Sequence, residues 1–291
     1  MRVGYFGPEG TFTQEALLAA TAGLSLELIA LPTIYDTVMA VHDRTVERAL
    51  VPIENSLEGS VNATLDSLAM ETEDVAIVGE VVHPIRHCLI ARSALELTEI
   101  EAVLSHPQAN AQCARFLRTR LPGAQVVAAS STADAVRTLA DHDGAWAALG
   151  TRAAAERYGC VVLRAGVEDV SDNETRFVWL APVGAPPGGP GEAERVLGPW
   201  KTAILFWGVG SEAPGWLVSC LSELSSREVN LTRIESRPRR QGLGRYMFFV
   251  DLEGRDTEPR VTEALAALRF HVESLRVLGS FPAWSGSGES P

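Results

Sequence analysis

The sequence has few cysteines, no long apolar run and no recognisable targeting segment. Its four cysteines, Cys88, Cys113, Cys160 and Cys220, are widely spaced and form no Cys-x-x-Cys pair. This spacing argues against a metal site or a disulfide framework and favours buried free thiols in a reducing compartment. No apolar run approaches the roughly 20 residues of a membrane span, and the N-terminal MRVGYFGPEG predicts a strand and a turn instead of a signal peptide. We therefore expect a cytoplasmic protein that does not enter a membrane.

Positive charge is also scarce. The chain has 25 Lys and Arg residues against 37 Asp and Glu residues, which gives a formal net charge of −12. A nucleic-acid-binding protein would show a basic stripe, so nucleic acid is not an expected partner. An anionic small molecule is not excluded, because exposed charges are screened beyond about 8 Å at physiological salt and one arginine in a cleft can outweigh the distant field.

Length and composition predict a folded protein of two domains. Hydrophobic residues make up 46% of the 291 residues and charged residues 21%, as in soluble globular proteins. The stretch VGAPPGGPGEAERVLGP, residues 183–199, is rich in Pro and Gly and lacks apolar periodicity, so it predicts a linker. The expected organisation is a first domain over residues 1–182, this linker, a second domain over 200–282 and a flexible tail over 283–291.

Strand-like and helix-like segments alternate through the first domain. Strands are predicted near residues 3–6, 26–31, 49–53, 75–91, 101–105, 125–129, 145–149 and 160–163, and helices near 11–20, 34–41 and 62–70. Apolar runs such as Val126-Val127-Ala128-Ala129 are typical of a sheet that is buried on both faces. The pattern predicts an α/β domain with a mainly parallel sheet, long enough to form two lobes.

The second domain has a tighter pattern. Its predicted elements are a strand at 202–207, a helix at 217–224, an extended segment at 229–236, a strand at 246–253, a helix at 261–268 and a strand at 272–281. The order βαββαβ predicts a ferredoxin-like fold. Both helices would cover one face of the sheet, which leaves the other face to a ligand, a second subunit or the first domain.

Two polar segments lie directly beyond predicted strands of the first domain. GPEGTFTQEA, residues 7–16, places Thr11 or Thr13 at a helix start, where backbone N–H groups attract anions. It lacks the GK[ST] of a phosphate loop, which argues against nucleotide binding. VPIENSLEGSV, residues 51–61, places Glu54-Asn55-Ser56 beyond a buried strand, where ligands collect in open α/β sheets. Without a ligand, the two segments are a capped turn and a polar loop.

Two further segments carry polar side chains at strand ends. SHPQANAQC, residues 105–113, places His106 after a strand, where it is either a base or a hydrogen-bonded loop residue. SDNETRFVWLA, residues 171–181, places Asp172, Asn173, Thr175 and Arg176 at the mouth of a buried strand, where chemistry often lies. The alternative for this segment is a polar turn that leads into a strand.

Together and in this order, the four segments resemble the motif set of prephenate dehydratase. ESRPRR, residues 235–240, preceded by PGWLVSCL, resembles the ACT regulatory domain attached to that enzyme. The resemblance covers the chain apart from the linker and the tail. It implies a two-lobed catalytic domain of the type II periplasmic-binding-protein kind, a ferredoxin-like ACT domain, and no metal or organic cofactor. The implied reaction is the decarboxylative dehydration of prephenate to phenylpyruvate, on the route to phenylalanine.

The resemblance also assigns roles to residues. The family's threonine-arginine-phenylalanine motif lines the active site and its threonine is held essential; here these are Thr175, Arg176 and Phe177. We expect Thr175 to donate a hydrogen bond to the departing hydroxyl oxygen and Arg176 to bind a substrate carboxylate in a bidentate geometry. Phe177 is expected to contact the ring or to belong to the core. The other expected substrate-binding residues are Thr11, Glu54, Asn55, Ser56, Gln108 and Asn173, of which Glu54 would need a proton or a partner beside a dianion.

The implied effector is L-phenylalanine. The ESRP signature is Glu235-Ser236-Arg237-Pro238, and the Gly-Ala-Leu-Val stretch that accompanies it in the family is Gly215-Trp216-Leu217-Val218 here. Trp216 replaces a small residue, so it either reshapes the effector pocket or packs at the helix start against a second subunit. The family's ACT domains pair across chains, which implies a homodimer or a homotetramer.

Two other functions stay open from the sequence. Arogenate, the amino form of prephenate, would need an acceptor for its ammonium group, and nothing in the sequence excludes it. A non-catalytic amino-acid sensor, with a binding-protein-like domain joined to an ACT unit, is the second, although the Thr175-Arg176 pair favours catalysis. Some family members carry an N-terminal chorismate mutase domain; the chain begins at the first dehydratase strand, so mutase activity is not expected.

Overall fold

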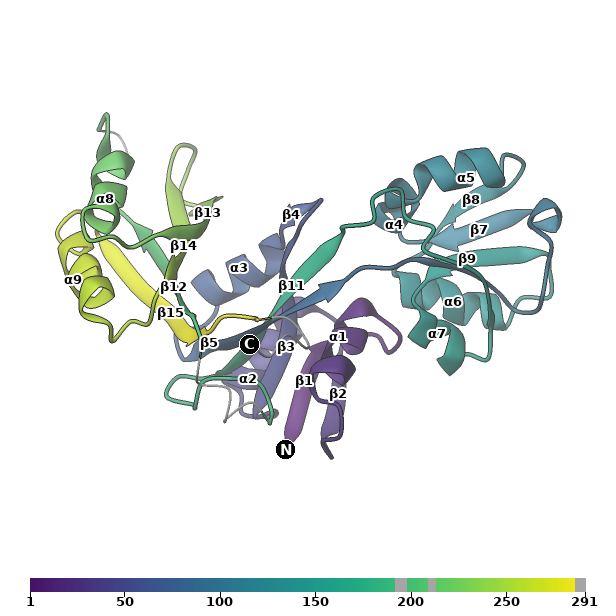
Figure 1. The fold of residues 1–291 in the computed structure, drawn as a ribbon, viewed down its shortest axis with the longest axis horizontal. Helices are drawn as coiled ribbons and strands as arrows, with labels where there is room; N and C mark the ends of the chain where they lie inside the picture. Colours follow the sequence, from purple (N-terminus) through teal and green to yellow (C-terminus); the bar gives the residue numbers. More distant parts are fainter. Residues whose placement is uncertain (192–197, 209–212, 286–291) are drawn as a thin grey trace.

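The computed structural model describes residues 1–191, 198–208 and 213–285. Figure 1 shows three parts in a row: lobe 2 (residues 85–170), lobe 1 (residues 1–84 and 171–191) in the middle, and the C-terminal domain (residues 200–285). Residues 192–197 of the predicted linker and residues 286–291 of the predicted tail lie outside the described residues.

Lobe 1 is built on a sheet of six strands. In spatial order these are β2 (Glu27–Leu31), β1 (Arg2–Phe6), β3 (Arg48–Asn55), β11 (Glu174–Pro182) and β5 (Val75–Pro84), and the short β4 (Gly59–Ser60) pairs with β3. Its helices are α1 (Phe12–Ala20), α2 (Ile34–His42) and α3 (Asn62–Met70). The hydroxyls of Thr11 and Thr33 accept backbone N–H groups in the first turns of α1 and α2, as N-cap residues do.

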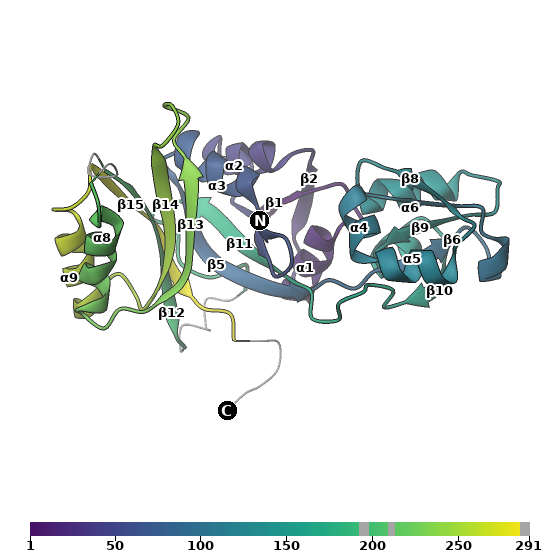
Figure 2. The ribbon, with the colours of Figure 1, turned by 90° about the horizontal axis from the view of Figure 1, so that it is seen from above.

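Lobe 2 has a five-stranded sheet in the order β10 (Val161–Ala165), β6 (Cys88–Ala91), β9 (Trp146–Gly150), β7 (Ala102–Ser105) and β8 (Gln125–Ala128). Its helices are α4 (Pro107–Gln112), α5 (Ala114–Arg120), α6 (Thr132–Ala140) and α7 (Arg152–Arg157), with a 3₁₀ turn, η1, at Leu97–Glu99. The chain enters lobe 2 after β5 and returns to lobe 1 in β11, so two strands connect the lobes (Figures 1 and 2).

The expectation of a mainly parallel sheet is wrong. In lobe 1, β1 is parallel to β2 and β3, but β11 is antiparallel to β3 and β5. In lobe 2, β7 is parallel to β8 and β9, but β6 is antiparallel to β9 and β10. The chain path explains this, because β5 leaves lobe 1 and β11 returns beside it in the opposite direction. A buried antiparallel strand gives the same apolar run as a buried parallel one, so the sequence pattern did not separate them.

The strand predicted from Val178-Trp179-Leu180-Ala181 is confirmed as the centre of lobe 1. All four residues are at most 1% exposed in β11, which lies between β3 and β5. The strand therefore has a rigid setting, and the polar residues at its beginning are held by the core that follows them.

The C-terminal domain confirms the predicted βαββαβ order. Its antiparallel sheet has the order β13 (Leu231–Pro238), β14 (Tyr246–Glu253), β12 (Trp200–Trp207) and β15 (Ser274–Pro282). The helices α8 (Trp216–Ser225) and α9 (Pro259–Leu268) pack on one face, where Ile204, Phe206, Val250 and Leu252 meet the apolar stripes of both helices.

Lobe 1 covers the other face of this sheet, which decides between the three occupants that the sequence allows. Ala203, Leu205, Met247 and Phe249 belong to the same apolar core as residues of α2, α3 and β3. Strand β15 crosses β5 closely: a Cβ on Gly279, whose φ is +156°, would lie 1.9 Å from the carbonyl oxygen of Ile77. Only glycine fits this contact, so the two domains form one packed body.

Candidate functional site

A cavity of about 310 Å³ lies between lobes 1 and 2. Lobe 1 contributes the end of β1, the start of α1 and the facing ends of β3 and β11, while lobe 2 contributes the starts of α4 and α6. The lining residues are Phe6, Gly7, Thr11, Phe12, Thr13, Ile34, Pro52, Asn55, Val61, Ile85, His87, His106, Gln108, Ala109, Gln112, Ser130, Ser131, Thr132, Thr175 and Phe177. The structure thus brings together five of the predicted site residues: Thr11, Asn55, Gln108, Thr175 and Phe177.

Thr175 is held on the cavity wall by Asn55. The two residues are partners in the β11–β3 ladder, and the Nδ2 of Asn55 donates to the Oγ1 of Thr175 at 2.9 Å. The Oδ1 of Asn55 accepts the backbone N–H groups of residues 57 and 58, both at 3.0 Å, which fixes the orientation of the amide. Because the Thr175 oxygen accepts here, the hydroxyl hydrogen remains free to be donated toward another acceptor.

A chain of side-chain amides continues from Asn55 across the lobes. Its Nδ2 also donates to the Oδ1 of Asn173 at 2.7 Å, and the Nδ2 of Asn173 donates to the Oε1 of Gln112 at 3.2 Å. The Nε2 of Gln112 in turn donates to Glu58 at 3.2 Å. Asn173 is fully buried and does not line the cavity. Asn173, predicted as a substrate-binding residue, therefore lies behind the cavity wall and supports Asn55.

His87 is the last member of this chain. Its Nε2 lies 3.0 Å from the Oε1 of Gln112, and an amide oxygen only accepts, so Nε2 carries the ring hydrogen. The Nδ1 of His87 is buried without a hydrogen-bond partner among the described residues. Burial lowers the pKa of His87 below its usual value, against the opposing effect of the Gln112 hydrogen bond. The ring is therefore neutral near pH 7.

The first turns of two nine-residue helices also line the cavity. Thr11 caps α1, and Ser131 caps α6 by accepting the N–H of Asp134 at 3.0 Å. Free N–H groups and the helix dipole make such ends favourable for anions. No Arg or Lys occurs among the described residues that line the cavity. An anionic ligand would therefore meet N–H groups and hydroxyls instead of a fixed cation.

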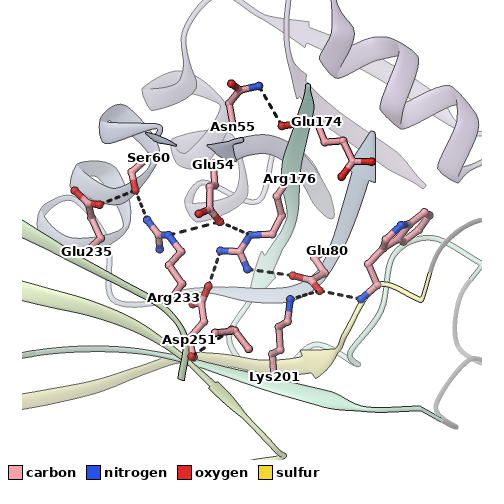
Figure 3. A network of polar contacts seen from close by, with 12 residues as sticks. Glu54, Asn55, Ser60, Glu80, Glu174, Arg176, Lys201, Arg233, Glu235 and Asp251 are labelled. Carbon is pink, nitrogen blue, oxygen red and sulfur yellow. Dashed lines mark hydrogen bonds and ion pairs between the residues drawn. The ribbon is translucent and has the colours of Figure 1, made fainter. Parts of the chain in front are cut away.

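The structure does not support Arg176 as an anchor for a substrate carboxylate. Its guanidinium contacts Glu54 and Glu80 at 3.2 Å and also Asp251 (Figure 3). Neither Arg176 nor any of these three carboxylates is among the residues that line the cavity. Side chains alternate along a strand, and Thr175 and Phe177 face the cavity, so Arg176 must face the other way.

Two more predicted site residues lie off the cavity wall. Glu54 faces Arg176 for the same reason. Ser56 hydrogen-bonds the backbone of residues 172 and 174, which joins the ends of β3 and β11 instead of facing the cavity. Of the predicted Glu54-Asn55-Ser56 triplet, the cavity therefore receives only Asn55.

A contact between the lobes lies beside the cavity. The hydroxyl of Thr151, the N-cap of α7, donates to the carbonyl of Gly10 at 2.8 Å. Gly10 has φ +85°, and an added Cβ would lie 3.0 Å from Ala154. The glycine in the predicted turn at residues 7–10 therefore permits both the left-handed backbone and the close approach of lobe 2.

The predicted effector residues divide into two groups. Gly215, Leu217 and Val218 line a second cavity of about 290 Å³, together with Trp216, Gly244, Tyr246 and others of the C-terminal domain. Trp216 packs against Phe206 and Phe248, and its Nε1 donates to the carbonyl of His271 at 2.7 Å. Trp216 thus anchors the start of α8 within its own domain.

The second group faces lobe 1. Along β13 the side chains of Glu235 and Arg237 point to lobe 1: Ser60 donates to Glu235 at 3.0 Å, and Arg237 holds Asp66 through two hydrogen bonds of 2.9 and 3.1 Å. Ser236 and Pro238 are exposed. The ESRP signature therefore forms part of the contact between the domains.

Sequence reasoning missed several cavity residues. Ser130, Ser131 and Thr132 lie just beyond the end of β8, and Asn55 is the last residue of β3, so the rule that drew attention to one strand end applied equally to the other. Gln112 lies inside the segment 105–113, one helical turn after Gln108. His87 follows the crossover strand β5, and no sequence signal marked it.

The described part of the chain offers no obvious metal ligand set. No group of three or more His, Cys, Asp or Glu side chains within it is arranged to hold a metal ion. No described helix is long and apolar enough to cross a membrane.

Comparison with known proteins identifies relatives over both domains. Residues 3–184 match the prephenate dehydratase family model, and residues 214–270 match the ACT domain model. The chain is 42% identical over 288 residues to a prephenate dehydratase of Amycolatopsis methanolica, which covers 98% of this chain and 90% of that protein.

Solved structures of similar fold extend the comparison. The crystal structure of prephenate dehydratase from Arthrobacter aurescens in complex with L-Phe has a TM-score of 0.86 and 35% identity, covering 97% of this chain and 90% of that one. The structure of GqqA, described as a novel type of quorum quenching acylase, has a TM-score of 0.83 and 30% identity, covering 98% of this chain and 99% of that one.

Proposed function

Because this chain belongs to the prephenate dehydratase family, we propose that it converts prephenate to phenylpyruvate, carbon dioxide and water in the cavity between its lobes. The observation that carries this proposal is the Asn55–Thr175 hydrogen bond of 2.9 Å. It occupies the Thr175 oxygen as an acceptor and leaves its hydrogen for the departing group.

The reaction needs two bonds to break across one ring. The bond between the ring and its carboxylate breaks, its electron pair moves through the ring, and the bond to the hydroxyl at the opposite position breaks. The hydroxyl leaves as water after it takes up a proton, so one proton from solvent is consumed. Thr175 donates a hydrogen bond to the departing oxygen as negative charge develops. A preorganised donor of this kind is worth about 2.7–4 kcal/mol in a dry site, and aromatisation supplies the larger driving force.

The substrate is a dianion, and the first turns of α1 and α6 are the groups that would bind its carboxylates. Thr11, Thr13, Ser131 and Thr132 provide hydroxyls beside the free N–H groups of both helices. Phe12 and Phe177 give the cavity apolar surface for the ring. Phe177 is only 1% exposed, so it serves both the core and the wall.

For regulation, we propose that L-phenylalanine binds beside Gly215, Leu217 and Val218 and that the C-terminal domains pair between subunits. The cavity of about 290 Å³ at these residues supports the first statement, as does the relative named in complex with L-Phe. The outer edge of β13 has no partner strand among the described residues, and Ile234 on it is 45% exposed, which supports pairing into a dimer or a tetramer.

The direct test mixes purified protein with prephenate and follows phenylpyruvate. Turnover is expected, and a folded wild type without turnover would reject the enzyme and leave the amino-acid sensor. Arogenate in a parallel assay decides the substrate, and a higher kcat/KM for arogenate would replace prephenate in the proposal. Calorimetry with L-phenylalanine tests the effector, since neither heat nor inhibition would mean that this ACT site is altered.

The only suggestion of a second activity, acyl-amide hydrolysis, is the name of one structural neighbour. A hydroxyl nucleophile for acyl transfer needs a base within hydrogen-bond reach. In the described residues, His87 is bonded to Gln112, and His106 accepts the backbone N–H of Gln108, so neither cavity histidine is paired with a Ser or Thr hydroxyl. No observation favours this activity over dehydration.

A further inference from the structure

The strand pair that carries Thr175 has a second face, turned away from the cavity. In the β11–β3 ladder Thr175 pairs with Asn55, and the next pair is Arg176 with Glu54. Because side chains alternate along strands, the Thr175–Asn55 hydrogen bond and the Arg176–Glu54 ion pair lie on opposite faces of the same two strands. A β-bulge follows at once, since Phe177 pairs with Pro52 and Ile53 is the extra residue.

On this second face, Arg176 ends in a cluster of charges at the boundary with the C-terminal domain (Figure 3). We call it the interface cluster; it consists of Glu54, Glu80, Arg176, Lys201, Arg233 and Asp251. Lobe 1 supplies the first three residues, and the C-terminal domain supplies the other three. The cluster therefore joins the strand that carries Thr175 directly to the C-terminal domain.

Arg176 is the central residue of the interface cluster. Its side chain is 10% exposed and contacts carboxylates on three different strands: Glu54 on β3, Glu80 on β5 and Asp251 on β14. Asp251 and Glu80 are nearly fully buried, so their charges depend on these partners. A guanidinium held from three sides fixes the backbone of β11 at the residue next to Thr175.

The cluster also reaches the ESRP signature. Arg233 lies 3.8 Å from Glu54 and donates to the hydroxyl of Ser60 at 2.7 Å, and the same hydroxyl donates to Glu235 at 3.0 Å. Lys201 of the C-terminal domain donates to Glu80 at 2.8 Å. The position of β13 is therefore connected to Arg176 through consecutive contacts of charged and polar groups.

We propose that Arg176 and its partner Asp251 are positioning residues for the dehydration, which hold β11 so that the Thr175 hydroxyl meets the departing oxygen. The inference rests on the proposed function, because it assigns Thr175 the donor role described above. If Asp251 is a positioning residue, turnover depends on a residue of the C-terminal domain that does not touch the substrate. Docking of that domain is thus part of the catalytic geometry.

The test compares isosteric charge removals in the full-length chain. Asp251→Asn keeps the shape of the side chain and removes its charge, and Glu54→Gln does the same at a site that is 38% exposed, where we expect the smaller effect on folding. Asp251→Asn is expected to lower kcat about tenfold, because small misplacements of a catalytic group are costly, with KM for prephenate unchanged within about twofold. Glu54→Gln is expected to lower kcat about threefold.

Arg276→Met is the matched control. Arg276 donates to the backbone carbonyls of Ala69 and Thr72 across the same domain boundary, and within the described part of the chain it has no hydrogen bond or ion pair with β3 or β11. It should lower the thermal midpoint as much as Asp251→Asn does and leave kcat unchanged. In an Asn55→Ala background, where Thr175 has already lost its donor, Asp251→Asn should change kcat less than in the wild type.

The possible results of this test distinguish the positioning role from the proposed dehydratase function. If the wild type is active and both charge removals keep kcat within about twofold, or if Arg276→Met lowers kcat equally, the positioning role is refuted while the dehydratase stands. Multiplicative losses in the Asn55→Ala background also refute it, because the two residues then act independently. A wild type without turnover refutes the proposed function itself.

Discussion

Replacement of Thr175 by valine is the sharpest test of the chemistry. Valine keeps the β-branched shape that suits β11 and removes only the hydroxyl. The Nδ2 of Asn55 loses one acceptor but keeps two, the Oδ1 of Asn173 at 2.7 Å and the carbonyl of Glu174 at 3.1 Å. No buried donor is left unpaired, so the expected cost to the free energy of unfolding is only about 1 kcal/mol.

The expected cost to catalysis is much larger. If the Thr175 hydroxyl stabilises the departing oxygen as an oxyanion-hole donor does, its loss raises the barrier by about 2.7–4 kcal/mol, which is roughly a 100- to 1,000-fold loss in kcat. KM for prephenate should change little, because the carboxylates are bound elsewhere. Thr175→Ser, which keeps the hydroxyl, should retain kcat within about tenfold of the wild type.

The assay is the initial rate of phenylpyruvate formation, with thermal unfolding measured on the same samples. Thr202→Val is the matched control, since Thr202 is also a buried strand threonine, its hydroxyl donates to the carbonyl of Gly254 at 2.8 Å, and neither residue lines the cavity. It should cost stability and leave kcat unchanged. If folded Thr175→Val keeps more than about a tenth of the wild-type kcat, the barrier change is below about 1.4 kcal/mol and the donor role is wrong.

Three other predictions follow from the site and the domain boundary. The wild type should lose stability as pH falls below 6.5, the pKa of the unfolded imidazole, by up to about 1.4 kcal/mol per pH unit. The reason is that burial lowers the folded-state pKa of His87, so the unfolded ring takes up the proton first. Thermal melts of His87→Asn with the same pH slope would contradict this. Ser131→Ala should raise KM for prephenate about three- to tenfold with little change in kcat, since it weakens the anion site at α6; an unchanged KM would place the carboxylates elsewhere. Gly279→Ala should lower the free energy of unfolding by about 1–3 kcal/mol, because the added Cβ would collide with the carbonyl of Ile77. An unchanged thermal midpoint would mean that β15 and β5 do not touch there.

The polar strand ends are what the sequence predicted best. Thr11 follows β1, Asn55 ends β3 and Thr175 lies at the start of β11, and the fold brings all three to one cavity because strand ends of both lobes converge there. The same rule holds for Ser131 after β8, so the sequence contains the information that places this residue at the site as well. His87 differs, since its place depends on the crossover from β5 into lobe 2, which only the tertiary structure defines.

The alternation of side chains along strands is enough to assign Arg176 and Asp251 to one face of their strands. Thr175 and Phe177 can share a face of β11, but Arg176 between them cannot join them there. In β14, Asp251 alternates with Val250 and Leu252, so it must lie on the face opposite the helices. What the sequence could not supply was the identity of the neighbour on that face, because it depends on how lobe 1 docks against the C-terminal sheet.

The position of the Arg176 guanidinium outside the cavity makes the proposed reaction easier to explain. The ring carboxylate begins as an anion and leaves as neutral carbon dioxide, so a fixed guanidinium beside it would stabilise the ground state more than the transition state and slow the chemical step. Helix N-termini and hydroxyls bind the dianion with less charge, and the apolar surface of Phe12 and Phe177 favours a neutral departing group. The arginine is instead used where a permanent charge is an advantage, in the interface cluster, where its ion pairs with Glu80 and Asp251 hold β11 in place.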